Sequence, residues 1–185
     1  MRAATIALLA LAAMIAAPAP FAAADGYAGQ QSRAIKALAP EEVRDLLDGR
    51  GMGLAKAGEL NHYPGPAHVI ELGDQLDLTS DQRGAVQASF ARMSAAARPL
   101  GAALIERERA LDRAFSEGTV TEASLAEATA AIGALQGRLR AVHLAAHLET
   151  RAVLTAAQIV RYDALRGYAA GVPGAPSASP HHHGG

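Results

Sequence analysis

The chain has 185 residues, a formal net charge of −1, no cysteine and no tryptophan, and half of its residues are hydrophobic. The missing cysteines exclude a disulfide framework, a thiol nucleophile and a thiolate metal site, and the near-zero charge argues against a nucleic-acid partner. With only three Phe and four Tyr, the core must consist of Leu, Ile, Val and Ala, which predicts one all-α domain.

Residues 1–24 have the features of a secretory signal peptide. Arg2 is their only charged residue, an apolar run follows, and three alanines precede Asp25. The apolar core covers roughly residues 3–17, which is shorter than the about 20 residues that a membrane-spanning helix needs. We therefore expect cleavage near Ala24 and Asp25, export to the periplasm, and no membrane insertion after the signal is removed.

Short elements are expected in the first part of the mature chain. Residues 25–39 lack a clear periodicity and are expected to form a flexible N-terminal arm. Pro40 then opens a short helix, since proline suits the first helical turn, and closely spaced glycines end it. Two more short helices are expected at 54–60 and 68–76, with a turn rich in Pro and Gly between them.

Two long helices follow, over residues 80–115 and 121–153. Their apolar residues recur at steps of three and four, which is the helical period. The connection contains Gly118 and is short, so the two helices must form an antiparallel hairpin. Pro99 lies inside the first of them and is expected to kink or divide it.

A last helix over 156–168 closes the expected helical domain, which spans residues 40–168. Residues 169–185 are rich in Pro, Gly and Ser and are expected to be disordered. A two-helix hairpin buries little apolar surface by itself. We therefore expect the short helices and a second copy of the chain to cover it, in a homodimer.

The pattern Leu-Thr-x-x-Gln occurs twice, each time at the expected start of a helix. In each copy the Thr side chain can cap the helix while the Gln reaches back to the N–H of the Thr, an arrangement known as a capping box. The residues of the two copies are Leu78, Thr79 and Gln82, and Leu154, Thr155 and Gln158.

The duplicated pattern, in an exported, all-helical chain without cysteine, resembles the Spy/CpxP family of periplasmic LTxxQ-motif proteins over roughly residues 40–168. The resemblance implies a bent antiparallel hairpin with short flanking helices, a cradle-like shape and a dimer. Members of the family act as ATP-independent chaperones, inhibit a membrane-bound stress sensor, or bind Zn, Ni, Co or Cu. The segments 51–55 and 162–168 are more similar to the heavy-metal-sensor and zinc-resistance branch.

Five residues are candidate metal ligands. His143 and His147 lie four residues apart, so they project from one face of the second long helix and can share a divalent ion. His68 and Glu71 lie three residues apart on an early helix, and His62 comes just before it. Such donors suit Zn, Ni, Co or Cu(II). The alternative interpretation is that these histidines are neutral and pack between helices.

The metal-sensing relatives carry two His and a Glu on early helices and a His-x-x-x-Met pair on a late one. Here His147 stands in place of the Met, and Leu72 stands where a second early His would be, which leaves the coordination number and the metal open. Among the methionines, Met93 is expected in the core and Met52 is a candidate soft ligand. A separate, weak metal site is expected in the tail at His181, His182 and His183.

Two functions therefore remain open. One is a metal-binding envelope-stress or heavy-metal-sensing protein. The other is a holdase that binds unfolded clients on an Arg-lined cradle without a specific metal role. The chain contains no nucleophile elbow and no phosphate loop, so we expect neither an enzyme nor an organic cofactor. The arginines that could line the cradle are Arg83, Arg92, Arg98, Arg107, Arg138 and Arg140.

Overall fold

The computed structural model describes residues 26–168, so the expected signal peptide and the histidines of the tail lie outside the described residues. Within this range the chain forms six α-helices and one 3-10 turn, Gln30–Ser32, and no strand, which confirms the all-α class. The helices are α1 Pro40–Asp48, α2 Lys56–Glu59, α3 Pro66–Glu71, α4 Ser80–Ser116, α5 Glu122–Val153 and α6 Ala156–Leu165.

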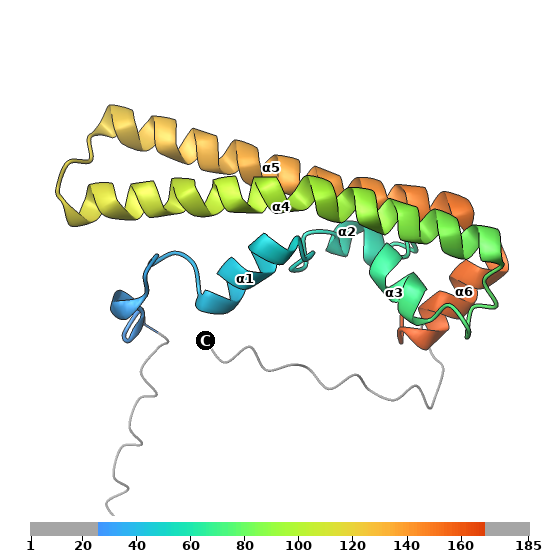
Figure 1. Cartoon of the computed structure of the whole chain (residues 1–185). Helices are drawn as coiled ribbons and strands as arrows, with labels where there is room; N and C mark the ends of the chain where they lie inside the picture. The colour runs from blue at the N-terminus through green and yellow to red at the C-terminus, as the bar shows by residue number, and fades with distance from the viewer. Residues whose placement is uncertain (1–25, 169–185) are drawn as a thin grey trace, which may run out of the picture.

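The two long helices α4 and α5 form the expected antiparallel hairpin (Figure 1). Gly118 makes the turn with a positive φ of 67°, which is easy for glycine. The Thr121 side chain then caps α5 by accepting a hydrogen bond from the Ser124 N–H. Pro99 lies within α4, yet the helix continues past it, so the expected division does not occur.

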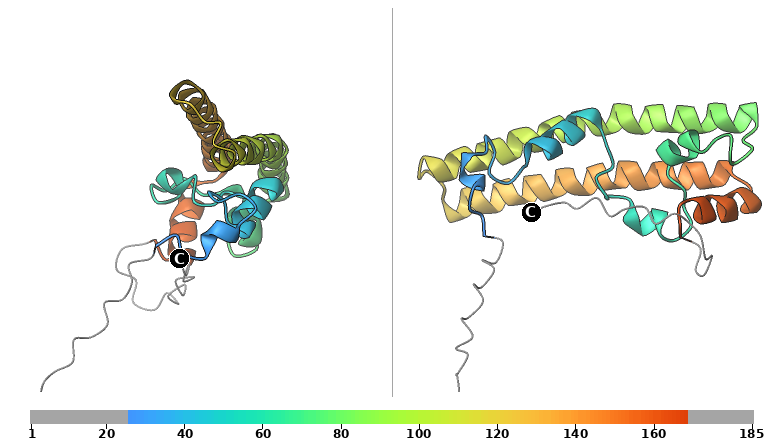
Figure 2. Two further views of the ribbon diagram at one scale, coloured as in Figure 1. Left: turned by 90° about the vertical axis from the view of Figure 1, so that its left-hand side faces the viewer. Right: turned by 90° about the horizontal axis from the view of Figure 1, so that it is seen from below.

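The short helices lie along one side of the hairpin, as the end-on view and the view from below show (Figure 2). The C-terminal end of α1 comes very close to α4 at Gly101, where an added Cβ would lie 2.2 Å from the Leu46 carbonyl oxygen. Gly49 then ends α1 with a φ of 71°. The backbone contact between Leu46 and Gly101 holds the end of α1 against α4, and the following loop begins at this place.

The apolar core has two clusters, one along the middle of the hairpin and one at its open end. The first lies under α1 and comprises Ile35, Leu46, Ala97, Leu104, Ile105, Ile132 and Leu139. The second lies under α3 and α6 and comprises Val69, Leu76, Val86, Leu154 and Tyr162. As the composition predicts, aliphatic side chains dominate both clusters.

The expected flexible arm is in part a packed segment. Ile35 is only 3% exposed and belongs to the first core cluster, and the Lys36 ammonium lies 3.3 Å from the Asp112 carboxylate. A single buried isoleucine produces no periodicity, so the sequence pattern does not reveal this anchor.

Three short helices have different ends from those expected. α2 and α3 are confined to Lys56–Glu59 and Pro66–Glu71. α3 starts at Pro66 because proline suits the first helical position. α6 ends at Leu165, since Gly167 has a left-handed φ of 73°. None of the helices described is long and apolar enough to cross a lipid bilayer.

Candidate metal centre

The two copies of the Leu-Thr-x-x-Gln pattern form capping boxes, as expected. The Thr79 hydroxyl accepts from the Gln82 N–H at 3.2 Å, and the Gln82 side chain accepts from the Thr79 N–H at 3.1 Å. The corresponding distances for Thr155 and Gln158 are 3.2 and 2.9 Å. These caps start α4 and α6.

The two glutamines also bind each other, which the local pattern did not indicate. Gln82 Nε2 donates to Gln158 Oε1 at 2.9 Å, and Gln158 Nε2 donates to Gln82 Oε1 at 3.0 Å. The same amides donate to the carbonyls of Val153 and Leu76 at 3.0 and 3.1 Å. The repeated motif thus joins the starts of two helices, beside the second core cluster.

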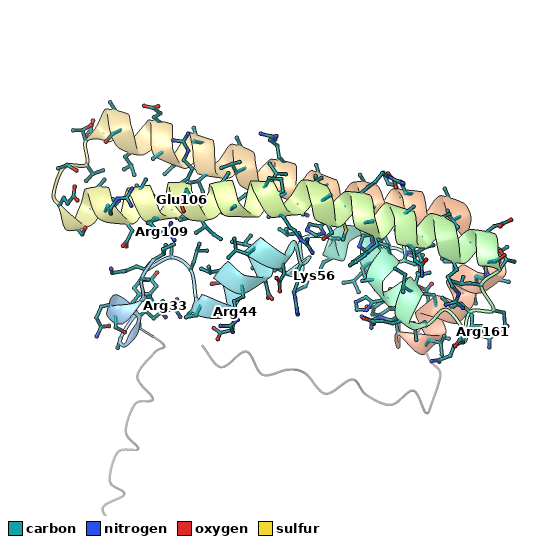
Figure 3. The ribbon with its side chains drawn as sticks, viewed as in Figure 1. Arg33, Arg44, Lys56, Glu106, Arg109 and Arg161 are labelled. Atoms are coloured by element: carbon teal, nitrogen blue, oxygen red, sulfur yellow. The ribbon has the colours of Figure 1, made fainter. Side chains whose placement is uncertain are left out.

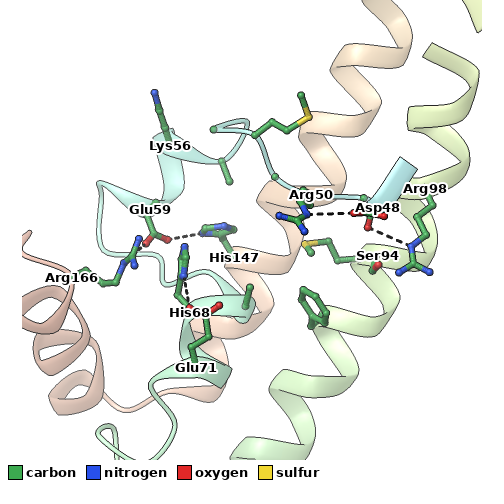
Figure 4. Close-up of a pocket in the computed structure, with 18 residues that line it drawn as sticks. Asp48, Arg50, Lys56, Glu59, His68, Glu71, Ser94, Arg98, His147 and Arg166 are labelled. Carbon is green, nitrogen blue, oxygen red and sulfur yellow. Dashed lines mark hydrogen bonds and ion pairs between the residues drawn. The ribbon is translucent and has the colours of Figure 1, made fainter. Parts of the chain in front are cut away.

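A pocket of about 690 Å³ lies between the short helices and the hairpin (Figure 4). Three of the five predicted ligands line it: His147 from α5, and His68 and Glu71 from α3. The loop after α1 forms part of its wall, and Met52 and Met93 also line it. The pocket is therefore where the structure brings most of the candidate ligands together.

His147 is held in a defined orientation. Its Nδ1 lies 2.7 Å from the carbonyl oxygen of Tyr63. Because a carbonyl only accepts hydrogen bonds, Nδ1 must carry the proton, and Nε2 of the neutral ring keeps its lone pair. Metal-binding histidines commonly donate their second ring N–H in this way.

Glu59 lies next to His147 and was not among the predicted ligands. Its side chain is 12% exposed. Its Oε1 accepts from the hydroxyls of Tyr162 at 2.5 Å and Tyr168 at 3.1 Å, and its Oε2 accepts from the Gly65 N–H at 3.1 Å. Burial, together with the hydrogen bond to Glu59, raises the pKa of Tyr162 well above its usual range, so this hydroxyl stays a donor.

The sequence pattern gives no signal for Glu59. It belongs to a four-residue helix, and its partners lie on other elements: Glu59 Oε2 is 3.6 Å from His147 Nδ1, and Arg166 Nε is 3.6 Å from Glu59 Oε1 (Figure 4). Such contacts depend on the fold and not on spacing along the chain.

His68 and Glu71 form a pair at the more exposed edge of the pocket. His68 Nδ1 lies 3.1 Å from Glu71 Oε2, as the i,i+3 spacing on α3 allows. The Glu71 side chain is 67% exposed. Solvent therefore competes for this carboxylate much more than for that of Glu59.

His143 is only 2% exposed, and its ring lies next to Gly51. Its Nε2 is buried without a hydrogen-bond partner in the described part of the chain. Burial, and secondarily the neighbouring His147, lowers the pKa of His143, so the ring is neutral at pH 7. It shares a helix face with His147, as expected, but is not among the residues that line the pocket.

His62 lies elsewhere. It has a left-handed φ of 66°, and its Nδ1 lies 2.6 Å from Asp163 Oδ2 on α6. Its backbone carbonyl accepts from Arg151. The turn before α3 thus directs this side chain to α6, away from the other candidate ligands.

The predicted five-residue ligand set is not assembled in this structure. Over residues 26–168, no three His, Asp or Glu side chains are grouped closely enough to hold a metal ion. The pocket does provide imidazole and carboxylate donors, which suit borderline divalent ions. The donor atoms are therefore of the kinds that bind such an ion. Among them, those of His147 and Glu59 lie next to each other.

The arginines expected on a client-binding cradle are partly engaged within the protein. Arg83 lies 2.8 Å from the Asp74 carboxylate, and Arg92 lies 2.7 Å from that of Glu149. Arg98 donates to the carbonyl of Asp48 at 3.4 Å. Other charged side chains, such as Arg44 and Arg161, are spread over the length of the molecule (Figure 3).

The family model described as heavy-metal resistance matches residues 52–161. This range includes both long helices, both copies of the Leu-Thr-x-x-Gln pattern and all residues of the pocket except residues 48–51 and Arg166. No curated protein and no solved structure matches the chain. The match covers more than half of the sequence, and the chain therefore belongs to the heavy-metal resistance family, within the Spy/CpxP-like helical proteins.

Proposed function

We propose that the protein acts in the periplasm in heavy-metal resistance or sensing, and that it binds a divalent ion, Zn²⁺, Ni²⁺, Co²⁺ or Cu²⁺, in the pocket between α3 and α5. The observation that carries the proposal is that His147 and His68, from elements far apart in the sequence, line one pocket in a protein of the heavy-metal resistance family. A carboxylate that lines the pocket would balance part of the positive charge of the ion.

The orientation of His147 supports this function. The Tyr63 carbonyl holds the proton on Nδ1 and leaves Nε2 able to bind a cation. The absence of cysteine from the sequence directs binding toward imidazole and carboxylate. The protein would act by binding and releasing the ion, not by catalysis, and the signal-like residues 1–24 support a periplasmic location.

The holdase alternative has less support. Arg83, Arg92 and Arg98 already interact with groups of the same chain. Fewer of the expected arginines therefore remain to bind unfolded clients. Suppression of client aggregation that is independent of metal would favour the holdase.

The test is calorimetric titration of the metal-free mature protein with Zn²⁺. The His147→Ala and His68→Ala variants should each bind at least about tenfold more weakly, since each loses a ligand. His62→Gln is the matched control, because His62 lies outside the pocket, and it should bind like the parent. All variants would carry Ala at 181, 182 and 183 to remove binding by the tail. An unchanged isotherm for His147→Ala would refute the proposed site.

A further inference from the structure

A second pocket, of about 470 Å³, is lined by residues of α1, α4 and α5 and of the segments on either side of α1. We call it the leucine pocket. Its volume lies within the range of small-molecule sites, which is about 300–1,000 Å³. Leu38 lies before α1 and Leu54 after it, so both flanking segments contribute an apolar side chain. Four separate parts of the chain thus meet around this space.

The inner surface of the leucine pocket belongs to the first core cluster, through Leu46, Leu104 and Leu139. On the side of α5 the pocket is lined by Gly133 and Gly137, and a Cβ at either position would meet nothing within 4 Å. Glycine is unfavourable inside a helix because it loses more conformational freedom than other residues on folding. The two glycines therefore leave a space over core leucines that larger side chains would fill.

Two charged residues line the leucine pocket, Glu42 and Arg140. The Glu42 carboxylate accepts a hydrogen bond from the Ala39 N–H at 2.7 Å, at the start of α1. The Arg140 guanidinium has no hydrogen-bond or ion-pair partner within residues 26–168. It is available to an anion, and a planar guanidinium can hold a carboxylate through two parallel hydrogen bonds.

The dimensions of the leucine pocket restrict the length of its ligand. Gly133 and Arg140 are seven residues apart on α5 and both line the pocket, so it extends for about 10 Å along this helix. An extended alkyl chain of about eight to ten carbons has a similar length. Because the guanidinium lies at one end of this stretch and buried leucines line the rest, a ligand that fits carries one acidic group at the end of an apolar chain.

We propose that the leucine pocket binds a medium-chain fatty acid, with the carboxylate on Arg140 and the alkyl chain over the core leucines toward Gly133. Burial of each further CH₂ group should raise the affinity about fourfold until the pocket is full. This site is separate from the proposed metal site, although Met52 lines both pockets.

The experiment is calorimetric titration of the mature protein in EDTA with hexanoate, octanoate and decanoate, each below the concentration at which it forms micelles. EDTA removes any contribution of bound metal ions. The affinity should rise about fourfold per added CH₂ from hexanoate to decanoate, with one site per chain. Decanol lacks the charge and should bind at least about tenfold more weakly than decanoate. No binding of decanoate, or an affinity that does not depend on chain length, would overturn the proposal.

Arg140→Met tests the contact with the carboxylate. It removes the charge and keeps an unbranched side chain, so it should weaken decanoate binding at least about tenfold and leave decanol binding within about threefold of the parent. Arg138→Met is the matched control, because Arg138 is on the same helix but does not line the leucine pocket. It should bind decanoate like the parent. An equal loss in both variants would overturn the assignment of Arg140, since any arginine would then serve.

Gly133→Leu tests the space itself. A Cβ at this position meets no other atom within 4 Å, and leucine favours a helix more than glycine does, so the variant should fold. Its side chain should fill the pocket and weaken decanoate binding at least about tenfold. Gly84→Leu is the matched control, a helical glycine with the same open surroundings but outside the leucine pocket. Circular dichroism checks the fold of each variant. Decanoate binding that survives in folded Gly133→Leu would overturn the proposal.

Discussion

His143 shows how one residue can be predicted to the correct helix face and still have a different environment from its neighbour. The spacing of four residues places it beside His147, but its ring is buried next to Gly51 and its Nε2 has no partner among the described residues. A buried polar atom without a hydrogen bond costs about 1–3 kcal/mol. The neutral ring limits this cost, since a charged one would be far more expensive.

A pH dependence of stability follows. The pKa of His143 is lower in the folded protein than its ordinary value of 6.5. The unfolded chain therefore takes up the proton first as the pH falls, and stability is lost from about pH 6.5 downward until the folded protein is protonated as well, at a rate of at most about 1.4 kcal/mol per pH unit. The free energy of unfolding of His143→Gln should fall less steeply as the pH is lowered. Urea unfolding of metal-free protein between about pH 7.5 and 5.5 measures this, and parallel curves for parent and variant would contradict it.

At the scale of elements, the capping pattern predicted the starts of α4 and α6 correctly, because a capping box involves residues only three apart. The contact between the two boxes could not be predicted in this way. Gln82 and Gln158 are distant in sequence, and only the folded hairpin brings their amides together. The same holds for Glu59, whose partners lie on α5, α6 and the turn before α3.

The contact between Gln82 and Gln158 should couple their contributions to the stability of the fold. Gln82→Ala and Gln158→Ala each remove both reciprocal hydrogen bonds, so their effects on the free energy of unfolding should not add. A double-mutant cycle should give a coupling of about 1 kcal/mol. The matched control is Ser124→Ala, which removes the hydroxyl that accepts from the Thr121 N–H at the start of α5 and should be additive with Gln82→Ala. Additive effects for the two glutamines would show that their contact does not stabilise the fold.

For the whole molecule, periodicity was sufficient to predict the hairpin and the all-α class, because the long helices repeat the pattern many times. It did not predict the packing of Ile35 or the pocket. The pocket gathers residues from short helices and loops whose sequences are too short to show a period. The expected dimer stays a prediction.

Metal binding should stabilise the whole fold. The pocket is lined by residues of α2, α3, α4 and α5 and of the loop after α1, and the Tyr162 hydroxyl on α6 donates to Glu59. An ion that binds only the folded chain adds about 2.7 kcal/mol when its free concentration is 100 times Kd. Zn²⁺ should therefore raise the Tm of the parent above its value in EDTA, and His147→Ala should abolish the rise. Replacement of the three tail histidines by Ala should leave it in place. An equal rise in His147→Ala would mean that the stabilising ion binds elsewhere.

The close approach of α1 to α4 at Gly101 has a consequence for access to the pocket. The loop that starts at Gly49 follows directly after α1 and forms one wall of the pocket. At the point of contact the distance between the two helices is limited by backbone atoms and not by interlocking side chains. A single methyl group at position 101 would therefore push α1 outward and carry the wall with it. The position of this wall thus depends on Gly101, a residue that does not itself line the pocket.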